Sequence, residues 1–184
     1  DEVESDGVKI AGVVVRNFSS VASRVGGSGT LQEDLEKNGT VGISDVDTRA
    51  LVRYIRENGA MNAILSTEEF DIDKLKLKLS KVPSMDGLAL SGEVSVSEAY
   101  DFSKLGSGHK VALVDLGLKR SIATCLTARG CDVRVFPWDV KADEILSWNP
   151  DGIMLSNGPG DPSAMPSVIE EVRKLVESGL PVFG

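Results

Sequence analysis

The sequence predicts an α/β protein of two domains that meet near residue 105. From about residue 110 onward, short apolar runs alternate with segments of helical periodicity, which is the pattern of a parallel sheet covered on both faces. Residues 1–105 lack that regular alternation, and the stretch 101–109, which contains Gly106, Ser107 and Gly108, has the composition of a linker. At 184 residues with 41% hydrophobic content, the chain can form two small cores or one large one.

The second domain is expected to contain four strands and three helices. The strands are short apolar runs, at Val111–Val114, Val133–Phe136, Gly152–Leu155 and Val182–Phe183. The helices are expected over Arg120–Arg129, Ala142–Trp148 and Ser167–Ser178. Gly130 and Gly179 follow the first and last of these helices, at positions where glycine commonly ends a helix. The helical spacing of Ile122, Cys125 and Leu126 predicts that these three side chains face the core.

The first domain is expected to open with a β-branched strand over Val8–Val15. Thr30 and Glu33 have the spacing of a capping box, which predicts a short helix that ends near Gly39. A brief strand at 41–43 follows, and Asp47 can cap a helix over Thr48–Asn58 that Gly59 ends.

The rest of the first domain is expected to hold one more strand and one more helix. The strand is expected at Met61–Leu65, and the helix is rich in lysine and directs Ile72, Leu75 and Leu79 inward.

Charge and cysteine content narrow the possible functions. A net charge of −8 argues against nucleic acid or an anionic membrane surface as the partner, because both attract basic proteins. No apolar stretch reaches the length of a membrane span, and the opening residues lack a signal-peptide pattern. Cys125 and Cys131 do not have metal-ligand spacing, and two thiols do not make a disulfide framework, which favours the cytoplasm.

A loop rich in glycine and proline, Ser156–Pro162, follows the third strand of the second domain. Gly and Pro in such a loop can simply solve a tight strand-to-helix turn. Alternatively, the N–H of Gly158, and that of Gly160, can point into a site, because loops at the carboxyl ends of parallel strands bind ligands in open α/β sheets. Backbone N–H groups placed there can bind a carboxylate or stabilise a developing oxyanion. The residues alone leave both interpretations open.

Four segments carry a resemblance to a known family. Asn149–Pro162 resembles the first signature of the class I, triad-type glutamine amidotransferases. Asp115–Ile122, Gly42–Arg49 and Arg56–Asn62 resemble the small, glutamine-hydrolysing subunits of carbamoyl-phosphate synthetase. The resemblance runs in one register from about Gly12 to Gly184, so it covers nearly the whole sequence.

The resemblance implies a fold and a domain arrangement. Residues 1–105 correspond to the small, swivelling-type α/β domain of that subunit, and residues 106–184 correspond to the first part of a flavodoxin-like class I amidotransferase domain. The sequence begins with Asp1 and stops at Gly184, where a strand is expected to lead into a loop. We therefore expect a truncated piece of a longer protein, with its own N-terminal segment missing.

The resemblance also implies chemistry. Glutamine is hydrolysed in that family by a Cys–His–Glu triad, with Gly158 serving the oxyanion hole and Gly160 binding glutamine through the backbone. The catalytic Cys is expected at the second residue after Gly184, with the His and Glu farther along, and a glutamine-contacting Ser is expected before Asp1. No catalytic residue is therefore expected in this chain, and we expect it to be inactive alone.

Partners and cofactors follow from the same resemblance. Ammonia passes to a large synthetase subunit that makes carbamoyl phosphate for arginine and pyrimidine biosynthesis, so the partner is that subunit in a heterodimer and the substrate is glutamine. ATP, Mg²⁺ and bicarbonate are used by the large subunit, and no cofactor or metal is expected in this chain.

Several charged residues have two interpretations. Lys119 is either solvated near a helix start or lies at the mouth of the site on a path for substrate or ammonia. The family usually has Asn where this chain has Ser121, which weakens any detailed role there.

Arg49, Arg53 and Arg56 recur at helical spacing, either as a solvated face with local ion pairs to Asp45 and Asp47 or as a contact with the large subunit. His109, the only histidine, is not expected to be catalytic.

Two other functions remain possible from the sequence. The chain can act only as a docking module for the large subunit, without catalysis. It can also belong to another class I amidotransferase, such as that of an anthranilate or guanylate synthetase, although those families do not explain residues 1–100.

Overall fold

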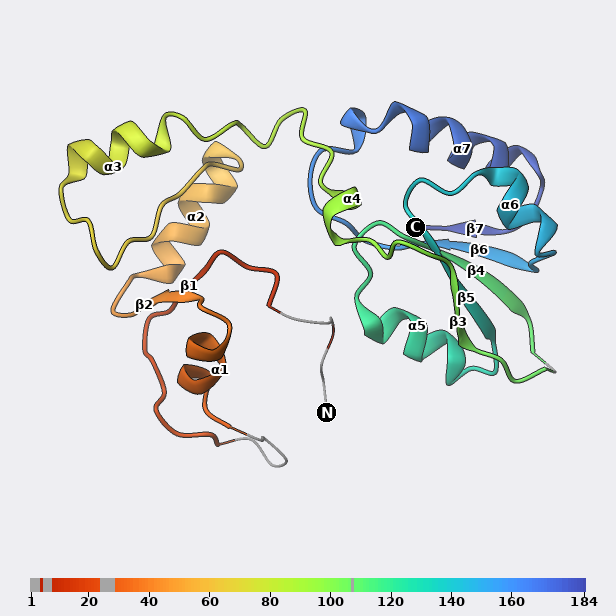
Figure 1. Cartoon of the computed structure of the whole chain (residues 1–184), viewed down its shortest axis with the longest axis horizontal. Helices are drawn as coiled ribbons and strands as arrows, with labels where there is room; N and C mark the ends of the chain where they lie inside the picture. The colour runs from red at the N-terminus through yellow and green to blue at the C-terminus, as the bar shows by residue number, and fades with distance from the viewer. Residues whose placement is uncertain (1–3, 5–7, 24–28, 107) are drawn as a thin grey trace. The chain divides into compact units, whose positions relative to one another are not determined.

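The computed structural model describes residues 4, 8–23, 29–106 and 108–184, and it divides into two compact units. The first unit comprises Asp1–Met85 and the second Asp86–Gly184 (Figure 1). The division falls about twenty residues before the boundary near 105 expected from the sequence. The reason is that residues 100–103 form a strand of the second unit's sheet rather than a linker.

The first unit contains two short strands and three helices. They are β1 (Gly12–Val14), α1 (Leu31–Lys37), β2 (Val41–Ile43), α2 (Thr48–Asn58) and α3 (Ile72–Leu79). β1 and β2 pair in parallel. The capping box predicted for α1 is confirmed, since the Thr30 hydroxyl accepts from the Glu33 N–H (3.2 Å) and the Glu33 carboxylate accepts from the Thr30 N–H (2.7 Å). The Thr30 N–H, and after it the Thr30 side chain, hold the pKa of the Glu33 carboxyl below its ordinary value.

Three expectations for the first unit were wrong. The strand expected over Val8–Val15 is limited to β1, and Met61–Leu65 forms no strand. There the Asn62 amide instead donates to the carbonyls of Val82 and Pro83, and Leu65 packs against Gly12. Ile72, expected inward, is 66% exposed because it begins α3.

The second unit is a five-stranded sheet with helices on both faces. Its elements are α4 (Ser91–Val94), β3 (Tyr100–Ser103), β4 (Lys110–Asp115), α5 (Arg120–Thr127), β5 (Asp132–Pro137), α6 (Ala142–Ser147), β6 (Gly152–Leu155), the 3₁₀ turn η1 (Pro162–Ala164), α7 (Pro166–Glu177) and β7 (Val182–Phe183). The strand order is β3-β5-β4-β6-β7. All neighbours are parallel except β3, which pairs antiparallel to β5 at one edge. The predicted parallel α/β sheet is therefore confirmed, with an added edge strand.

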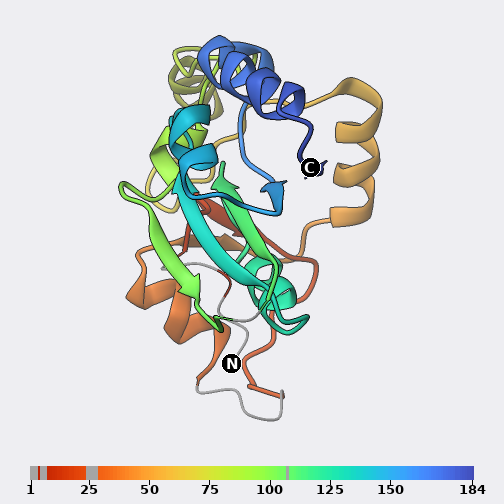
Figure 2. The ribbon, with the colours of Figure 1, turned by 90° about the vertical axis from the view of Figure 1, so that its right-hand side faces the viewer.

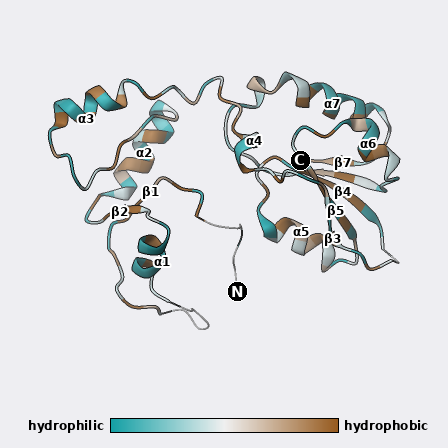
Figure 3. Cartoon of the chain, in the orientation of Figure 1, coloured by the Kyte–Doolittle hydropathy of each residue, from teal (hydrophilic) through white to brown (hydrophobic). Residues whose placement is uncertain are grey.

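The alternation of side chains along the strands produces two apolar layers. Leu113, Val133 and Val135 pack with Ala123 of α5 on one face. On the other face, Val114 and Phe136 pack with Ile145 of α6 and Leu175 of α7. Figure 2 shows the strands running between these helices, and Figure 3 shows hydrophobic segments along the same strands.

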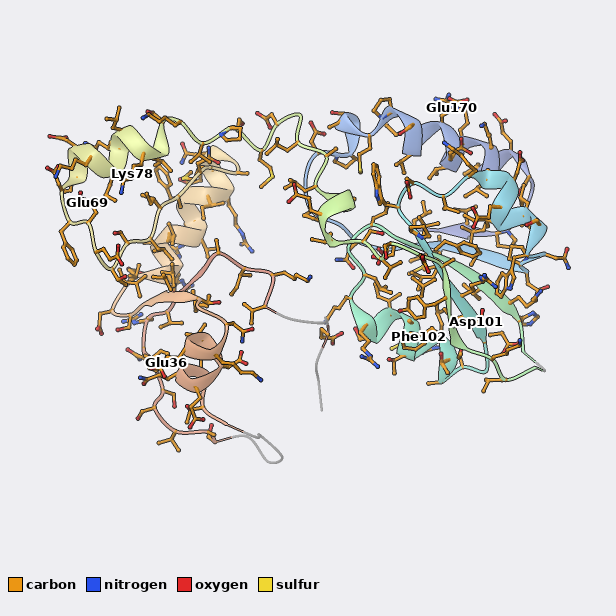
Figure 4. All side chains as sticks on the ribbon, viewed as in Figure 1. Glu36, Glu69, Lys78, Asp101, Phe102 and Glu170 are labelled. Atoms are coloured by element: carbon orange, nitrogen blue, oxygen red, sulfur yellow. The ribbon has the colours of Figure 1, made fainter. Side chains whose placement is uncertain are left out.

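One edge of the sheet is reinforced by contacts outside these layers. Asp101 of β3 pairs with Arg134 of β5 across 3.6 Å, and the Arg120 guanidinium lies 6.0 Å from the centroid of the Phe102 ring (Figure 4). Glu170 lies on the solvent side of α7, where it contacts Arg173 at 2.8 Å. In the described part of the chain, no helix is long and apolar enough to cross a membrane.

Candidate functional site

The topology of the second unit places two loops side by side at the carboxyl edge of the sheet. β4 and β6 are neighbours, but β4 leads through α5 to β5 on one side, whereas β6 leads through α7 to β7 on the other. The loops that follow the two strands therefore diverge, which makes this edge the topological switch point where open α/β sheets bind ligands. The loop after β6 is Ser156–Asp161, which η1 follows.

Ser156 and Asn157 join the two loops. The buried Ser156 hydroxyl accepts from the Leu116 N–H (2.9 Å) and donates to the Asn157 carbonyl (2.7 Å). The Asn157 amide donates to the Gly117 carbonyl (3.1 Å). These two roles were not predicted from the sequence, although two polar residues directly after a buried strand are a signal that could have indicated them.

Gly158 must be glycine because the two loops approach so closely. A Cβ at this position would lie 2.2 Å from the Leu116 carbonyl oxygen, far inside van der Waals contact. Gly160 is constrained in two ways, since its φ is +90° and a Cβ would lie 2.5 Å from the Leu88 carbonyl oxygen. Glycine alone adopts such a backbone without strain and leaves this room.

The N–H groups of Gly158 and Gly160 have no acceptor within the described part of the chain. Gly158 is exposed and Gly160 is half-buried. Since free backbone N–H groups bind carboxylates or oxyanions well, the geometry provides two donors for a negatively charged or carbonyl oxygen. The structure brings these two predicted residues together in one loop.

Asp115, at the end of β4, holds the loop that follows this strand through hydrogen bonds to backbone. This buried carboxylate accepts three N–H groups, from Gly117 (2.9 Å), Leu118 (2.6 Å) and Val96 (2.9 Å). All of its contacts are to backbone, so its role is to shape the loop. No individual role for Asp115 was predicted from the sequence.

Asp161 closes the loop after β6. Its carboxylate accepts from the Ser163 hydroxyl (2.7 Å) and N–H (2.9 Å) and from the Gly87 N–H (3.1 Å). Its own N–H donates to the Leu88 carbonyl (2.9 Å). The hydrogen bond from the Ser163 side chain, followed by those from the two N–H groups, lowers the pKa of Asp161. The contacts with Gly87 and Leu88 could not be predicted from the sequence, because Gly87 lies 74 residues before Asp161.

Lys119 lies at the same edge, where it is the N-cap residue of α5 and is exposed. It follows the loop that Ser156 and Asn157 contact. The structure is therefore compatible with both interpretations of Lys119, as a solvated residue and as part of the site's mouth.

Cys125 does not face the core, contrary to the sequence prediction. It is exposed, because Ala123 rather than Cys125 occupies the most buried position of α5. Cys125 instead lines an open groove of about 320 Å³ with Ser121 and Arg129, one helical turn away on either side. Cys131 is half-buried against the core.

Cys131 and His109 lie at the other edge of the sheet. Cys131 directly precedes β5 and His109 directly precedes β4, so both are at the edge where the parallel strands begin. His109 is exposed and lies 3.7 Å from the Asp151 carboxylate. Neither side chain is at the edge that carries the Gly158 and Gly160 N–H groups.

The arginines of α2 are all exposed, and the local ion pairs expected for them are absent among the described residues. Asp47 instead caps the helix by accepting from the Ala50 N–H (3.0 Å). The Asp45 carboxylate accepts from the Ser44 hydroxyl. Arg49, Arg53 and Arg56 are therefore exposed, and no carboxylate within residues 4, 8–23, 29–106 and 108–184 pairs with them.

Comparison with known proteins gives matches to two families. Residues 112–184 match the glutamine amidotransferase class-I family, and residues 1–65 match the CPSase domain of the carbamoyl-phosphate synthase small chain. A carbamoyl phosphate synthase small chain from Parasynechococcus marenigrum (strain WH8102) is 39% identical over 100% of this chain. Those of Chlorobaculum tepidum and Neisseria meningitidis serogroup A are 40% and 39% identical over 98% and 100% of it.

The chain belongs to the carbamoyl phosphate synthase small chain family. The match covers both units in one alignment, which excludes a likeness confined to the amidotransferase fold. The chain spans about half the length of these curated relatives, 52% of the first and 50% of that from Chlorobaculum. The two family domains also agree with the fold class predicted from the sequence.

Proposed function

We propose that the loop at residues 156–162 is the glutamine-binding and oxyanion half of a glutaminase centre. The whole protein hydrolyses glutamine to glutamate and ammonia, and a large synthetase subunit uses the ammonia to make carbamoyl phosphate for arginine and pyrimidine biosynthesis. ATP and Mg²⁺ act on that large subunit. The observation that carries the proposal is the pair of N–H groups on Gly158 and Gly160 at the topological switch point, for which the described residues provide no acceptor.

In the proposed reaction, a thiolate attacks the carboxamide carbon of glutamine, and the negative charge that develops on its oxygen is met by the Gly158 N–H. Ammonia then leaves, and water hydrolyses the thioester to glutamate. The Gly160 N–H holds the substrate through the backbone. Lys119, at the same edge, lies at the mouth of the site on the path of substrate or ammonia.

The thiolate comes from a cysteine that follows β7 in the whole protein. β6 and β7 are parallel, and a Cβ on Gly184 would lie 3.2 Å from the Leu155 Cβ. A residue after Gly184 therefore emerges at the carboxyl edge, beside the loop that begins at Ser156. Cys125 and Cys131 do not take this role, and we propose that the 184-residue chain alone is inactive.

The substitution Gly158→Ala in the whole protein, assembled with its large subunit, tests this function. The added methyl group collides with the Leu116 carbonyl and moves the N–H, so glutamine-dependent synthesis should fall about 10²- to 10³-fold. Synthesis from free ammonia should be unchanged, which shows that the complex is intact. Gly179→Ala is the matched control, because Gly179 has a φ of +80° but nothing within 4 Å of its Cβ position.

The second candidate is a docking module without catalysis, and the exposed surface of α2 favours it. No residue of this helix is buried, and Val52 and Tyr54, on either side of Arg53 in the sequence, are exposed. Figure 3 shows both hydrophilic and hydrophobic segments along α2. Such a mixture of arginine and apolar side chains is common at protein interfaces. The same assay separates the candidates, because docking alone predicts that Gly158→Ala leaves glutamine-dependent synthesis at the rate of the unsubstituted complex.

A further inference from the structure

A segment before β3, residues 87–96, crosses the carboxyl edge of the sheet, and we call it the strap. It contacts the loops after three strands. The Val96 N–H donates to Asp115 at the end of β4, and the Ser95 hydroxyl accepts from the backbone N–H of Trp138 after β5 (3.0 Å). Gly87 and Leu88 both bind Asp161 after β6. Figure 1 shows α4, which is part of the strap, at the edge where β7 ends.

The strap touches the candidate loop backbone to backbone. The Cβ position of Gly160 is 2.5 Å from the Leu88 carbonyl oxygen and 3.0 Å from the Leu90 nitrogen. The Cβ position of Gly117, in the neighbouring loop, is 3.2 Å from a methyl group of Val94. The strap therefore forms a wall against both loops that carry the proposed site.

Asp161 is the residue that ties the strap to the loop. Its N–H and its carboxylate bind Leu88 and Gly87, so the backbone on the C-terminal side of Gly160 is held from two directions. Gly160 has no side chain of its own to restrict it, and glycine loses more conformational freedom on ordering than any other residue. If the Gly160 N–H is to be held ready for a ligand, contacts from other residues must restrict its backbone.

We infer that Asp161 is a positioning residue, which anchors the strap and thereby holds the Gly158–Gly160 backbone in the geometry that binds glutamine. Asp161 acts through the loop and does not itself touch the substrate. This inference rests on the proposed glutaminase function of the same loop, and it adds a role for residues 87–96, which no sequence pattern suggested.

The test compares a substitution that breaks the bond between Asp161 and the strap with one that removes only the bond from the Ser163 hydroxyl to Asp161. Asp161→Ala removes the carboxylate that holds Gly87, whereas Ser163→Ala removes one partner of Asp161 and leaves the strap bonded. In the whole protein with its large subunit, Asp161→Ala should lower kcat/KM for glutamine by about 10- to 100-fold. Ser163→Ala should change it less than about 3-fold, and synthesis from ammonia should be unchanged in both.

A spectroscopic measurement on the 184-residue chain reports the strap directly. A Cβ at Gly92 would lie 3.0 Å from the Trp138 ring, so this indole senses whether the strap is in place. With the other tryptophan replaced by Trp148→Phe, Asp161→Ala should shift Trp138 emission to longer wavelength, and Ser163→Ala should not. Asp161→Asn, which keeps the side chain's shape, replaces Asp161→Ala if the alanine variant does not fold.

The outcomes separate this inference from the proposed function. If Gly158→Ala abolishes glutamine use while Asp161→Ala and Asp161→Asn act like Ser163→Ala, the positioning role is wrong and the proposed function stands. If Gly158→Ala has no effect, the proposed function itself fails. An unchanged Trp138 spectrum in Asp161→Ala would also overturn the role of the strap.

Discussion

Buried polar side chains at the carboxyl edge of the sheet are used to hold backbone. Asp115 satisfies three N–H groups, and Ser156 satisfies one N–H and one carbonyl. Ser91 is different, because its hydroxyl is 0% exposed and has no hydrogen-bond partner among the described residues. A buried hydroxyl without a partner costs free energy, since it has given up its bonds to water.

Ser91→Ala should therefore stabilise the protein by about 1 kcal/mol, because it removes an unsatisfied group from a buried position. Ser156→Ala should destabilise it by about 1–3 kcal/mol, because it leaves the Leu116 N–H without its acceptor. Urea unfolding followed by circular dichroism measures both free energies of unfolding. A loss of stability in Ser91→Ala as large as that in Ser156→Ala would contradict the assignment of Ser91 as unsatisfied.

At the scale of secondary structure, α6 is capped by a residue from another helix. Its own N-cap residue, Lys141, makes no side-chain capping bond. Glu171 of α7 instead accepts from the Ala142 N–H (2.9 Å), and Lys174 lies 3.1 Å from the same carboxylate. The bond from Ala142 is the largest cause that holds the pKa of Glu171 below its ordinary value, and the bond from Lys174 is the second.

The pKa of Glu171 is lower in the folded protein than in the unfolded chain. The contribution of Glu171 to the free energy of unfolding is therefore complete above the ordinary glutamate pKa of about 4.3. The contribution is lost as the pH falls from there through the lowered value. Glu171→Gln should thus be less stable than the unsubstituted chain at pH 7 and lose less stability on acidification to pH 3. Denaturant unfolding at both pH values measures this. Glu170→Gln, on the exposed side of α7, is the control. On acidification to pH 3 it should lose as much free energy of unfolding as the unsubstituted chain loses.

An element could be predicted from the sequence where the residues that determine it lie close together in the chain. The caps Thr30 and Asp47 act within one helical turn, and α1 and α2 begin where these residues predict. The strands β4 to β7 follow from short apolar runs and were also predicted. β3 was missed because only its pairing with β5, about thirty residues later, makes Tyr100–Ser103 a strand.

The same distinction between local and long-range contacts applies to the residues of the candidate site. Gly158 and Gly160 could be proposed from the sequence because two glycines on either side of a proline, directly after an apolar strand, are visible in a few residues. Asp161 and the strap were not found, because their contacts join residues far apart in the chain. The prediction that Cys125 faces the core was wrong, because helical spacing alone does not decide which of two neighbouring helix faces packs against the core.

At the scale of the whole molecule, the two units differ in how much core they contain. Among the described residues, Leu35 is the only buried hydrophobic residue of the first unit, and the others all lie in the second. The second unit therefore supplies the rigid scaffold for the loop at 156–162. It contains the whole amidotransferase family match, residues 112–184, and the chain spans about half the length of its curated relatives.

The purified 184-residue chain should release no glutamate from glutamine. Cys131 lies at the opposite edge of the sheet from the Gly158 and Gly160 N–H groups, and Cys125 lies on α5 in a groove with Met154, so we expect neither thiolate to act beside these N–H groups. A coupled glutamate dehydrogenase assay measures the release, with the whole protein as the positive control. Glutamate release that persists in the Cys125→Ser, Cys131→Ser double variant would reveal a nucleophile other than these thiols, and any release at all would contradict the expected inactivity.

The bond between Gly87 and Asp161 closes a loop of 74 residues, and this separation bears on how the protein folds. Contacts between distant residues carry a larger loop-closure entropy than local ones and tend to form slowly. During synthesis, the strap leaves the ribosome well before its anchor exists. The binding loop should consequently reach its final geometry after the central strands have paired, so that in refolding the recovery of the Trp138 signal lags behind that of secondary structure.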